Sequence, residues 1–256
     1  MLKTLFKRKA KTSPLNTAWM PEGVRLYAIG DIHGRLDLLD ELLDRIERDN
    51  KALPDADVHL VFLGDLIDRG PDSSGVIDRA IALQSSWGDH VHFIMGNHEE
   101  VFLGAASGDE KLVRFFCRIG GRETILSYDI TLEDYQQLHI EELSERIPAL
   151  IPQSHVDFVS RFEDRLVFGD YAFVHAGVRP GTAITDQNVK DLRWIREDFI
   201  LDKEPHDKVI VHGHTITEQV EERSNRIGID TGAYMSGVLT ALVLEGNQRR
   251  YLQTGA

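Results

Sequence analysis

Short apolar runs alternate with helical patterns along the first 100 residues. Residues 24–29, 58–63 and 91–95 are almost continuously apolar and rich in β-branched or aromatic side chains, which is typical of buried strands. Between these runs, residues 35–50 and 73–86 carry apolar side chains at helical spacing. Strands that alternate with helices in this way predict a layered α/β fold.

The pattern changes over residues 98–165, where apolar positions are periodic and β signals are few. It predicts short helices at about 98–105, 110–118, 121–127, 132–146 and 154–163. Gly120-Gly121 and the segment from Pro148 to Pro152 are expected to separate some of them. We interpret this insertion as a helical cap beside a cleft, within a single domain of residues 22–256.

Short strands are expected to predominate after residue 166. Apolar runs at 171–174 and 209–211 resemble the earlier buried strands. Residues 238–244 and 249–252 flank Gly246, and this pair predicts a terminal hairpin that covers the sheet.

Charge is unevenly distributed. Residues 1–21 carry five basic side chains and no acidic ones, which predicts a flexible basic arm. Leu2, Leu5 and Phe6 leave weak contact of this arm with a membrane surface as an alternative. The whole chain has a net charge of −13, so removing those five positive charges leaves −18 for the rest. Such a body should repel nucleic acid and phosphate, and a phosphate site would need its own positive charge.

Composition indicates an ordinary globular protein. Hydrophobic residues make up 42% of the 256 positions and charged residues 28%. No apolar run approaches the about 20 residues of a membrane span, and the N-terminus lacks a signal-like apolar segment. A single cysteine, Cys117, excludes an intrachain disulfide framework and fits a reducing compartment. We therefore expect a cytoplasmic protein without an integral membrane segment.

Five of the predicted strands end beside a residue that can bind a metal ion. These residues are Asp31 and His33, Asp65, Asn97, His175, and His214. Because the carboxyl ends of strands in an α/β sheet lie along one edge, we expect these side chains to meet. Asp31 and His33 are two residues apart on what we take to be an extended segment, which would place both on one face. Six oxygen and nitrogen donors predict a site for more than one metal ion.

The same residues lie in short motifs, which are GDIHG (30–34), GDLIDRG (64–70), GNHEE (96–100), HAG (175–177) and HGHT (212–215). These motifs and their order resemble the phosphoprotein phosphatase family of calcineurin-like metallophosphoesterases. IDTGA (229–233) and Trp194-Ile195-Arg196 resemble the small bacterial and bacteriophage serine/threonine phosphatases of that family. The resemblance implies an α/β/β/α sandwich of two mixed sheets flanked by helices, with a helical cap insertion.

The resemblance also implies a dinuclear metal centre. It gives Asp31, His33 and Asp65 to one ion, and Asp65, Asn97, His175 and His214 to the second. Oxygen and nitrogen donors without a thiolate fit Mn²⁺, which we expect, and are also compatible with Fe or Zn²⁺. His212 competes with His214, but the related pattern places the ligand after the glycine. We therefore favour His214 and expect His212 to have a supporting or structural role.

Four further residues have catalytic or phosphate-binding roles by the same resemblance. His98 would be the general acid, and Asp68 would hold its other ring nitrogen. Arg69 and Arg196 would bind the phosphate group, because a guanidinium matches two phosphate oxygens. Arg193 is a nearby rival of Arg196, and we interpret it as a surface residue.

Other polar residues of the motifs are expected to have supporting roles. We expect Asp230 to support His214, and Glu99 and Glu100 to cap a helix or line the entrance of the site.

The predicted reaction is hydrolysis of phosphate monoesters by direct attack of a metal-bound hydroxide, without a covalent phosphoenzyme. Phosphoserine and phosphothreonine proteins or peptides are the expected substrates, and small phosphoesters are also compatible. The alternative enzyme is a diadenosine tetraphosphate (bis(5'-nucleosyl)-tetraphosphate) hydrolase. In that group the second motif lacks the aspartate before arginine and the third commonly reads GNHD, so Asp68 and GNHEE favour the protein phosphatase.

A third hypothesis is a non-catalytic module that binds phosphoproteins. Such a module would be expected to have lost a metal ligand or His98. The sequence retains all of these residues.

Overall fold

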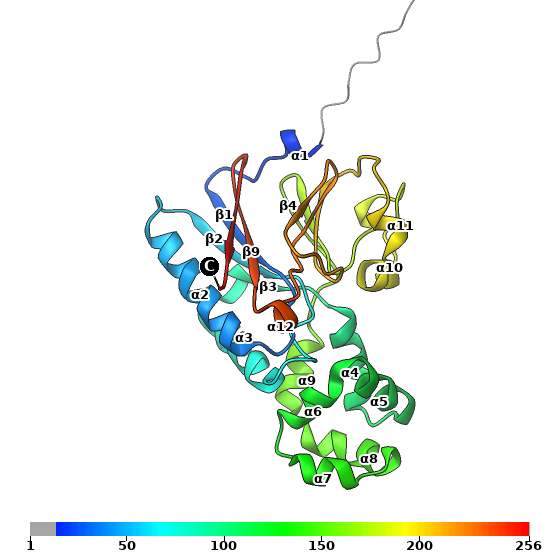
Figure 1. Ribbon diagram of the computed structural model, residues 1–256. Coiled ribbons are helices and arrows are strands. Elements are labelled where there is room, and N and C mark those ends of the chain that lie inside the picture. Colours follow the sequence, from blue (N-terminus) through cyan, green and yellow to red (C-terminus); the bar gives the residue numbers. More distant parts are fainter. Residues whose placement is uncertain (1–13, 256) are drawn as a thin grey trace, which may run out of the picture.

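Two five-stranded sheets lie face to face in the computed structural model, which describes residues 14–255. The first sheet has the strand order β10-β9-β1-β2-β3 and the second has the order β4-β5-β6-β8-β7. Each combines three parallel strands with antiparallel neighbours. Helices α2 and α3 cover the outer face of the first sheet, and α10 and α11 cover that of the second (Figure 1). The predicted sandwich of two mixed sheets flanked by helices is confirmed.

The strands of the first sheet are β1 (Val24–Ile29), β2 (Asp57–Phe62), β3 (Val91–Phe93), β9 (Thr240–Glu245) and β10 (Gln248–Gln253). Those of the second are β4 (Leu166–Phe168), β5 (Tyr171–Phe173), β6 (Val209–His212), β7 (Glu221–Glu222) and β8 (Arg226–Gly228). The helices of the sandwich are α1 (Pro14–Thr17), α2 (Leu36–Lys51), α3 (Ser73–Trp87), α10 (Val189–Trp194), α11 (Glu197–Ile200) and α12 (Ala233–Ser236), with 3-10 turns η1 (Gly88–His90) and η3 (Ile184–Asp186).

Side-chain alternation along the strands explains the layers. In β1, Tyr27 and Ile29 pack in the core under the helices, whereas Leu26 and Ala28 pack in the core between the sheets. Strands with two buried faces read as continuous apolar runs, which is why the sequence pattern predicts them well. In β6, Ile210 packs in a third core, under α10 and α11.

Helix α2 shows why these segments form helices. Its buried side chains, Leu38, Leu39, Leu42, Leu43 and Ile46, recur at a spacing of three or four residues. This spacing gives the helix one apolar face, which packs on the first sheet.

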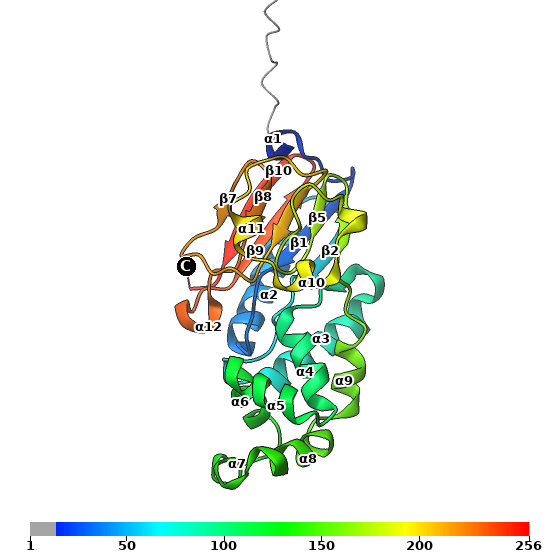
Figure 2. The same ribbon diagram turned by 90° about the vertical axis from the view of Figure 1, so that its right-hand side faces the viewer.

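The insertion after β3 forms a helical layer at one end of the sandwich (Figure 2). It contains α4 (Asn97–Ala106), α5 (Glu110–Phe116), the π-helical turn η2 (Cys117–Gly121), α6 (Arg122–Leu126), α7 (Leu132–Gln137), α8 (Ile140–Leu150) and α9 (Gln153–Val159). Phe102, Phe116 and Ile147 of these helices belong to the same core as Tyr27 and Phe62 of the first sheet. The insertion therefore packs against the sheet through one continuous apolar core.

Two helix predictions in the insertion are wrong. The predicted helix 132–146 is divided into α7 and α8, because His139 is extended and its backbone N–H donates to Glu142, which starts a new helix. The expected break at Pro148 is absent, since α8 continues to Leu150. Buried Leu143 and Ile147 hold this last turn, although proline removes one backbone donor.

The two chain ends differ from expectation. Residues 1–13 of the predicted arm, with any membrane contact they make, lie outside the described residues. Residues 14–21 are folded: Leu15, Ala18 and Met20 are buried in the core between the sheets, because they are apolar and lie beside its open end. The terminal hairpin does not cover the sheet. β9 pairs with β1 and so extends the sheet at its edge.

No helix within residues 14–255 is long and apolar enough to cross a membrane.

Candidate metal centre

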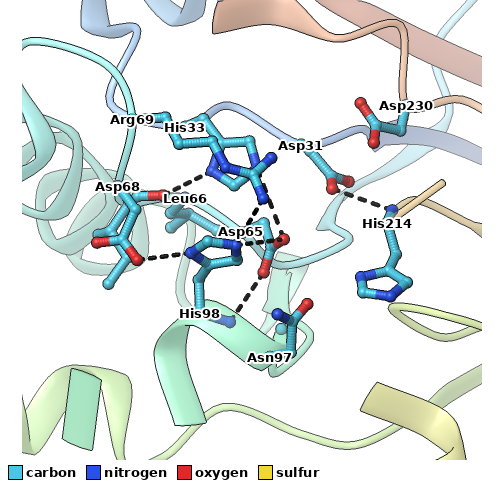
Figure 3. A network of polar contacts seen from close by, with 12 residues as sticks. Asp31, His33, Asp65, Leu66, Asp68, Arg69, Asn97, His98, His214 and Asp230 are labelled. Atoms are coloured by element: carbon cyan, nitrogen blue, oxygen red, sulfur yellow. Dashed lines mark hydrogen bonds and ion pairs between the residues drawn. The ribbon is translucent and has the colours of Figure 1, made fainter. Parts of the chain in front are cut away.

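The six candidate metal ligands lie together where the strands of both sheets end. Three strands of the first sheet and two of the second bring them there, so the site forms between the sheets and not along one edge. All six are buried, and Figure 3 shows Asp65 close to His33, His98 and Asn97. The residues are Asp31, His33, Asp65, Asn97, His175 and His214.

Asp65 faces imidazoles on both sides. Its Oδ2 is 3.6 Å from Nε2 of His33, and its Oδ1 is 3.3 Å from Nε2 of His175. The ligand atoms of Asp65, His175 and His214 lie within 4.8 Å of one another, as do those of Asp65, His33 and His98. A carboxylate shared by two such groups is suited to bridging two cations.

Backbone carbonyl oxygens set the tautomers of two imidazoles. Nδ1 of His33 is 2.7 Å from the carbonyl oxygen of Ile67, and Nδ1 of His175 is 2.8 Å from that of Leu63. These Nδ1–H groups donate to the carbonyls, which leaves the Nε2 lone pairs directed into the site. Partners of this kind orient metal-binding histidines.

More hydrogen-bond acceptors than donors therefore meet at the candidate metal centre. Around Nε2 of His175 lie Oδ1 of Asn97 at 2.9 Å and Nδ1 of His214 at 3.2 Å. Oδ1 of Asp31 and Nε2 of His214 are buried and have no hydrogen-bond partner among residues 14–255. Buried polar atoms without partners are costly, and a cation would satisfy them. The donor set thus fits divalent metal ions.

Two glycines let the backbone approach the carboxylates. A Cβ on Gly213 would lie 2.0 Å from Oδ1 of Asp31, and one on Gly96 would lie 2.3 Å from Oδ1 of Asp65. Any side chain at these positions would displace a candidate ligand. This requirement gives a physical reason for the glycines in HGHT and GNHEE.

Burial and nearby positive charges keep His33 and His214 neutral. Burial lowers the pKa of His33 to about 3, and burial together with His175 and Arg196 lowers that of His214 to about 2. Burial works against the charge of Asp65, but His175 and His98 outweigh it and hold the pKa of this carboxyl well below its usual range. A neutral imidazole and an ionised carboxylate are the forms that bind metal.

The backbone is strained at the site. His33, Asp65, Asp68, Arg69 and His214 have positive φ values, and all non-glycine residues with positive φ in the described part of the chain are among these five. The expected extended segment at His33 is therefore wrong, since its φ of 48° turns the chain after Asp31. Such residues cost about 1–3 kcal/mol each and persist where neighbours hold them in place, often at functional sites.

Glu99 holds much of this strained loop. Its carboxylate accepts hydrogen bonds from the backbone N–H groups of Asp65 at 2.8 Å and Leu66 at 2.7 Å. It also accepts from the N–H of Gly96 at the start of α4, which is the expected capping contact. Burial raises the pKa of Glu99 to about 7. Sequence reasoning found the cap but not the link to Asp65, because the residues are 34 positions apart.

His98 pairs with Asp68, as the resemblance implies. Nδ1 of His98 is 2.5 Å from Oδ2 of Asp68. Burial would lower the pKa of His98, but Asp65 and Asp68 outweigh it and raise the pKa. Oδ1 of Asp68 accepts a hydrogen bond of 2.6 Å from Thr124 of α6, so the insertion helps to fix this pair. Sequence reasoning missed Thr124, since nothing in its local pattern marks it.

Arg69 points into the site. Its guanidinium nitrogens lie 2.9 Å from Nε2 of His33 and 3.0 Å from Nε2 of His98. The ring of Tyr234 lies 5.0 Å from the guanidinium carbon and also contacts His33 edge-on. This placement puts a permanent positive charge beside the candidate ligands.

Arg196 lies between α10 and α11. It is exposed at the start of α11 and lines a cavity of about 280 Å³. Its positive charge contributes to the low pKa of His214, but none of the candidate ligands lines this cavity. Arg193 is not the surface residue that we expected. Its side chain is only 17% exposed and pairs with Asp164 at 2.6 Å, because a buried guanidinium needs a carboxylate partner.

Glu100 connects the insertion to Trp194 at the end of α10. Its Oε2 accepts a hydrogen bond of 2.6 Å from Nε1 of Trp194. This contact places Glu100 beside Trp194, and Glu100 is not among the candidate ligands, while its role at the entrance of the site stays a prediction.

Two other residues occupy supporting positions. His212 packs edge-on against Phe199, burial lowers its pKa to about 4, and its Nδ1 lies 3.0 Å from the carbonyl oxygen of Gly213. It does not belong to either group of candidate ligands. Asp230 does not contact His214 as expected. Its carboxylate accepts from the N–H of Gly232, because the turn there directs the side chain back onto its own backbone.

Asp31 and Asp230 influence one another. Burial raises the pKa of Asp31, and the charges of Asp230 and Asp65 raise it further. Figure 3 shows Asp31 between Asp230 and His214, and its Oδ2 accepts from the backbone N–H of His214 at 3.0 Å. So much negative charge in a buried place attracts cations.

Comparison with known proteins gives consistent results. A family model described as calcineurin-like phosphoesterase matches residues 24–234. The bis(5'-nucleosyl)-tetraphosphatase PrpE of Anoxybacillus flavithermus, of the asymmetrical type, is 29% identical over 239 residues, which cover 84% of this chain and 88% of that protein.

Solved structures share the fold. A protein provisionally described as a diadenosine tetraphosphatase aligns with a TM-score of 0.61 and 21% identity, over 90% of this chain and 93% of that one. A protein serine/threonine phosphatase of Saccharomyces cerevisiae aligns with a TM-score of 0.55 and 15% identity, over 92% of this chain and 81% of that one. At these identities the likeness concerns the fold alone.

Proposed function

The chain belongs to the calcineurin-like phosphoesterase family, and we propose that it hydrolyses dinucleoside polyphosphates such as diadenosine tetraphosphate. The reaction class rests on one observation: Asp65 lies between two groups of buried, metal-compatible side chains, with His98 and Arg69 beside it. The substrate rests on the similarity to a bis(5'-nucleosyl)-tetraphosphatase along most of both chains. This similarity favours our alternative hypothesis over the phosphoprotein phosphatase.

In this proposal, the six candidate ligands hold two divalent ions. Asp31 and His33 serve one ion, Asn97, His175 and His214 serve the other, and Asp65 serves both. When bound, the ions supply Lewis acidity that activates water and neutralises phosphoryl oxygens. We assign no metal identity, since Mn²⁺, Fe and Zn²⁺ all suit these donors.

The remaining side chains bind the substrate and move a proton. Arg69 and Arg196 bind non-bridging oxygens of the phosphoryl group from two sides of the centre. His98 donates a proton from Nε2 to the departing oxygen, and Asp68 holds its Nδ1–H. Glu99 keeps the Asp65 loop in place while charge develops.

An open cavity beside Arg69 supports a nucleotide substrate. It has a volume of about 700 Å³, and its lining includes Arg35, Tyr234, Leu36 and Pro71 together with the acidic residues Asp37, Asp40 and Asp72. Tyr234 offers an aromatic ring for stacking a base, whereas Arg35 is already paired with Asp37 at 2.6 Å. A phosphoryl group at Arg69 would thus have room for a nucleoside next to it.

Phosphoserine and phosphothreonine proteins remain the second candidate substrates. The pairing of Asp68 with His98 favours them, because a serine or threonine alkoxide is a poor leaving group that needs a proton donor. A polyphosphate leaving group is a much weaker base and needs this proton less.

Turnover of both substrate classes tests the proposal. Metal-stripped protein is reloaded with Mn²⁺, Fe²⁺ or Zn²⁺, and kcat/KM is measured for diadenosine tetraphosphate and for a phosphoserine peptide. We expect higher kcat/KM for diadenosine tetraphosphate, with asymmetrical cleavage to AMP and ATP in chromatographic analysis. Turnover of the peptide alone would assign the protein to the second candidate class, and no metal-dependent turnover of either would reject both.

A further inference from the structure

Histidines also gather far from the candidate metal centre, at the start of β2 and β3. Nε2 of His59 lies 3.3 Å from Oδ2 of Asp57, and Nε2 of His90 lies 3.0 Å from Oδ1 of the same carboxylate. The ligand atoms of these three residues are all within 4.8 Å of one another. Asp57, His59, His90 and the adjacent His92 are called the His59 cluster here.

This cluster is separate from the site already described. His59 lies near the start of β2, whereas Asp65 follows three residues after the strand ends at Phe62. At about 3.3 Å per residue, the three steps from His59 to Phe62 alone correspond to roughly 10 Å. None of the four residues has a contact with the candidate ligands in the described structure, and the proposed reaction does not use them.

The environment of His59 resembles that of a metal-binding histidine. Its side chain is only 11% exposed, and its Nδ1 lies 3.2 Å from Nε2 of His92. A proton on Nδ1 of His59, donated to His92, leaves the Nε2 lone pair free to face Asp57 and His90. This arrangement matches the outer hydrogen bond that fixes the tautomer of metal ligands.

Neighbouring elements hold the rings in place. His59 stacks on His92 at 5.4 Å between ring centroids, and Phe168 of β4 packs against His59 at 4.9 Å. His90 belongs to the short turn η1 between α3 and β3, and its ring is 4.9 Å from that of His59. The side chains of Asp57 and His90 are 55% and 50% exposed, so an ion can enter from solvent.

We propose that the His59 cluster binds one Zn²⁺ ion through Asp57, His59 and His90. Two imidazoles and one carboxylate are a ligand set that Zn²⁺ uses, and water can complete a tetrahedron on the exposed side. Imidazole ligands select transition metals over Mg²⁺ and Ca²⁺, which require oxygen ligands.

A bound ion would connect two parts of the chain. Asp57 and His59 belong to β2, whereas His90 lies in η1, which leads into β3. Because the ion would bind the folded chain and not the unfolded one, it would stabilise this end of the first sheet. The role of the site is therefore structural, distinct from that of the proposed catalytic ions.

Counting Zn²⁺ ions tests the proposal. The full chain is dialysed against buffered free Zn²⁺, and bound zinc per chain is measured for wild type, His90→Ala and Asp57→Ala. His139→Ala is the matched control, because His139 is also exposed but lies in the insertion. We expect both cluster variants to hold one Zn²⁺ fewer than wild type, and the control to hold the same number.

Three further measurements separate this site from the catalytic centre. His92→Ala should weaken the zinc affinity of the His59 cluster about 10–100-fold without abolishing zinc binding there. Side-chain nitrogen NMR should show zinc-dependent shifts of His59 and His90 that disappear in Asp57→Ala. Metal-dependent hydrolysis by His90→Ala should equal that of wild type.

Equal zinc content in wild type, His90→Ala and Asp57→Ala would overturn the proposal. So would zinc-dependent NMR shifts of other histidines alone. Neither result would affect the proposed hydrolysis, since that is measured separately as turnover.

Discussion

His98 is the proposed general acid, and this role can be tested by replacing its side chain. Its Nδ1 is held by Asp68 and its Nε2 faces Arg69 and Asp65. If His98 is the general acid, His98→Ala should lower kcat on a phosphoserine peptide about 10²–10⁴-fold. The loss should be smaller for diadenosine tetraphosphate and for p-nitrophenyl phosphate, whose leaving groups are weaker bases.

Metal content separates this role from that of a ligand. Because His98 also lies in a group of potential ligand atoms with His33 and Asp65, its replacement could remove an ion instead. We expect His98→Ala to retain as many ions per chain as wild type, as measured by elemental analysis. Equal losses on all substrates, or a lost ion, would contradict the acid role.

The two arginines are expected to act on phosphate and not on the metal ions. Arg69→Ala and Arg196→Ala should each reduce kcat/KM and weaken inhibition by inorganic phosphate, with unchanged metal content. Lysine at either position should recover only part of the loss, because an ammonium cannot form the two-pronged contact. Arg79→Ala, which removes a surface ion pair with Asp40, is the control. If Arg196→Ala retains wild-type kcat/KM and phosphate inhibition, Arg196 only packs beside the site.

Sequence motifs predict the candidate ligands because each ligand directly follows a strand. They do not predict the positive φ values of His33 or Asp65, since those depend on what surrounds the turn. Asp65 is held by Glu99, and Asp68 is held by Thr124, which is 56 residues away in the chain. Such long-range contacts leave no local pattern. The same holds for Arg193, whose partner Asp164 could not be identified from its neighbours.

At the scale of elements, the helical insertion takes part in the site. Thr124 of α6 donates to Asp68 and accepts from its backbone N–H at 2.9 Å, and the N–H of Arg69 donates to the carbonyl of Gly120 at 3.0 Å. Thr124→Val keeps the shape but removes both contacts of the hydroxyl with Asp68, together with its contact with Ser73 at 2.9 Å. We expect kcat to fall by at least about tenfold.

Thr124→Ser provides the matched control, because it restores the hydroxyl. It should recover most of the activity, while both variants keep the metal content of wild type. A Thr124→Val protein with wild-type kcat would show that α6 packs beside the site without positioning Asp68.

Element predictions were best where one face or both faces of an element are apolar. β1 and α2 follow directly from such patterns. The sequence pattern does not reveal α10 or α11, because each buries few side chains, such as Leu192 and Phe199. The division between α7 and α8 depends on the cap at His139, which competes with a helical pattern that continues through it.

At the scale of the whole molecule, Asp49 joins distant parts of the chain. It lies in α2, accepts a hydrogen bond from Tyr27 of β1 at 2.6 Å, and pairs with Arg250 of β10 at 2.6 Å. Burial would raise the pKa of Asp49, but the hydrogen bonds from Arg250 and Tyr27 outweigh it and lower the pKa below its usual value. The ionised carboxylate therefore stabilises the fold.

The sign of this effect predicts its pH dependence. Because the pKa is lower in the folded chain, the stabilisation is fully present above the unfolded pKa of about 3.9 and is lost as pH falls through the folded value. In urea unfolding, wild type should be more stable than Asp49→Asn at pH 6–7, and the difference should shrink below about pH 4. A difference that stays constant down to pH 3 would contradict this assignment.

We expect hydrolysis to depend on two ions, both of which Asp65 would help to hold. The most direct measurement is kcat on diadenosine tetraphosphate against the number of Mn²⁺ ions bound per chain, in the His90→Ala background so that the His59 cluster does not contribute. We predict activity only as the second ion binds, and loss of activity with Asp65→Asn, which should also lose more metal than Asp31→Asn. Full activity with one ion, or an Asp65→Asn protein that still binds two ions at full occupancy, would contradict the account.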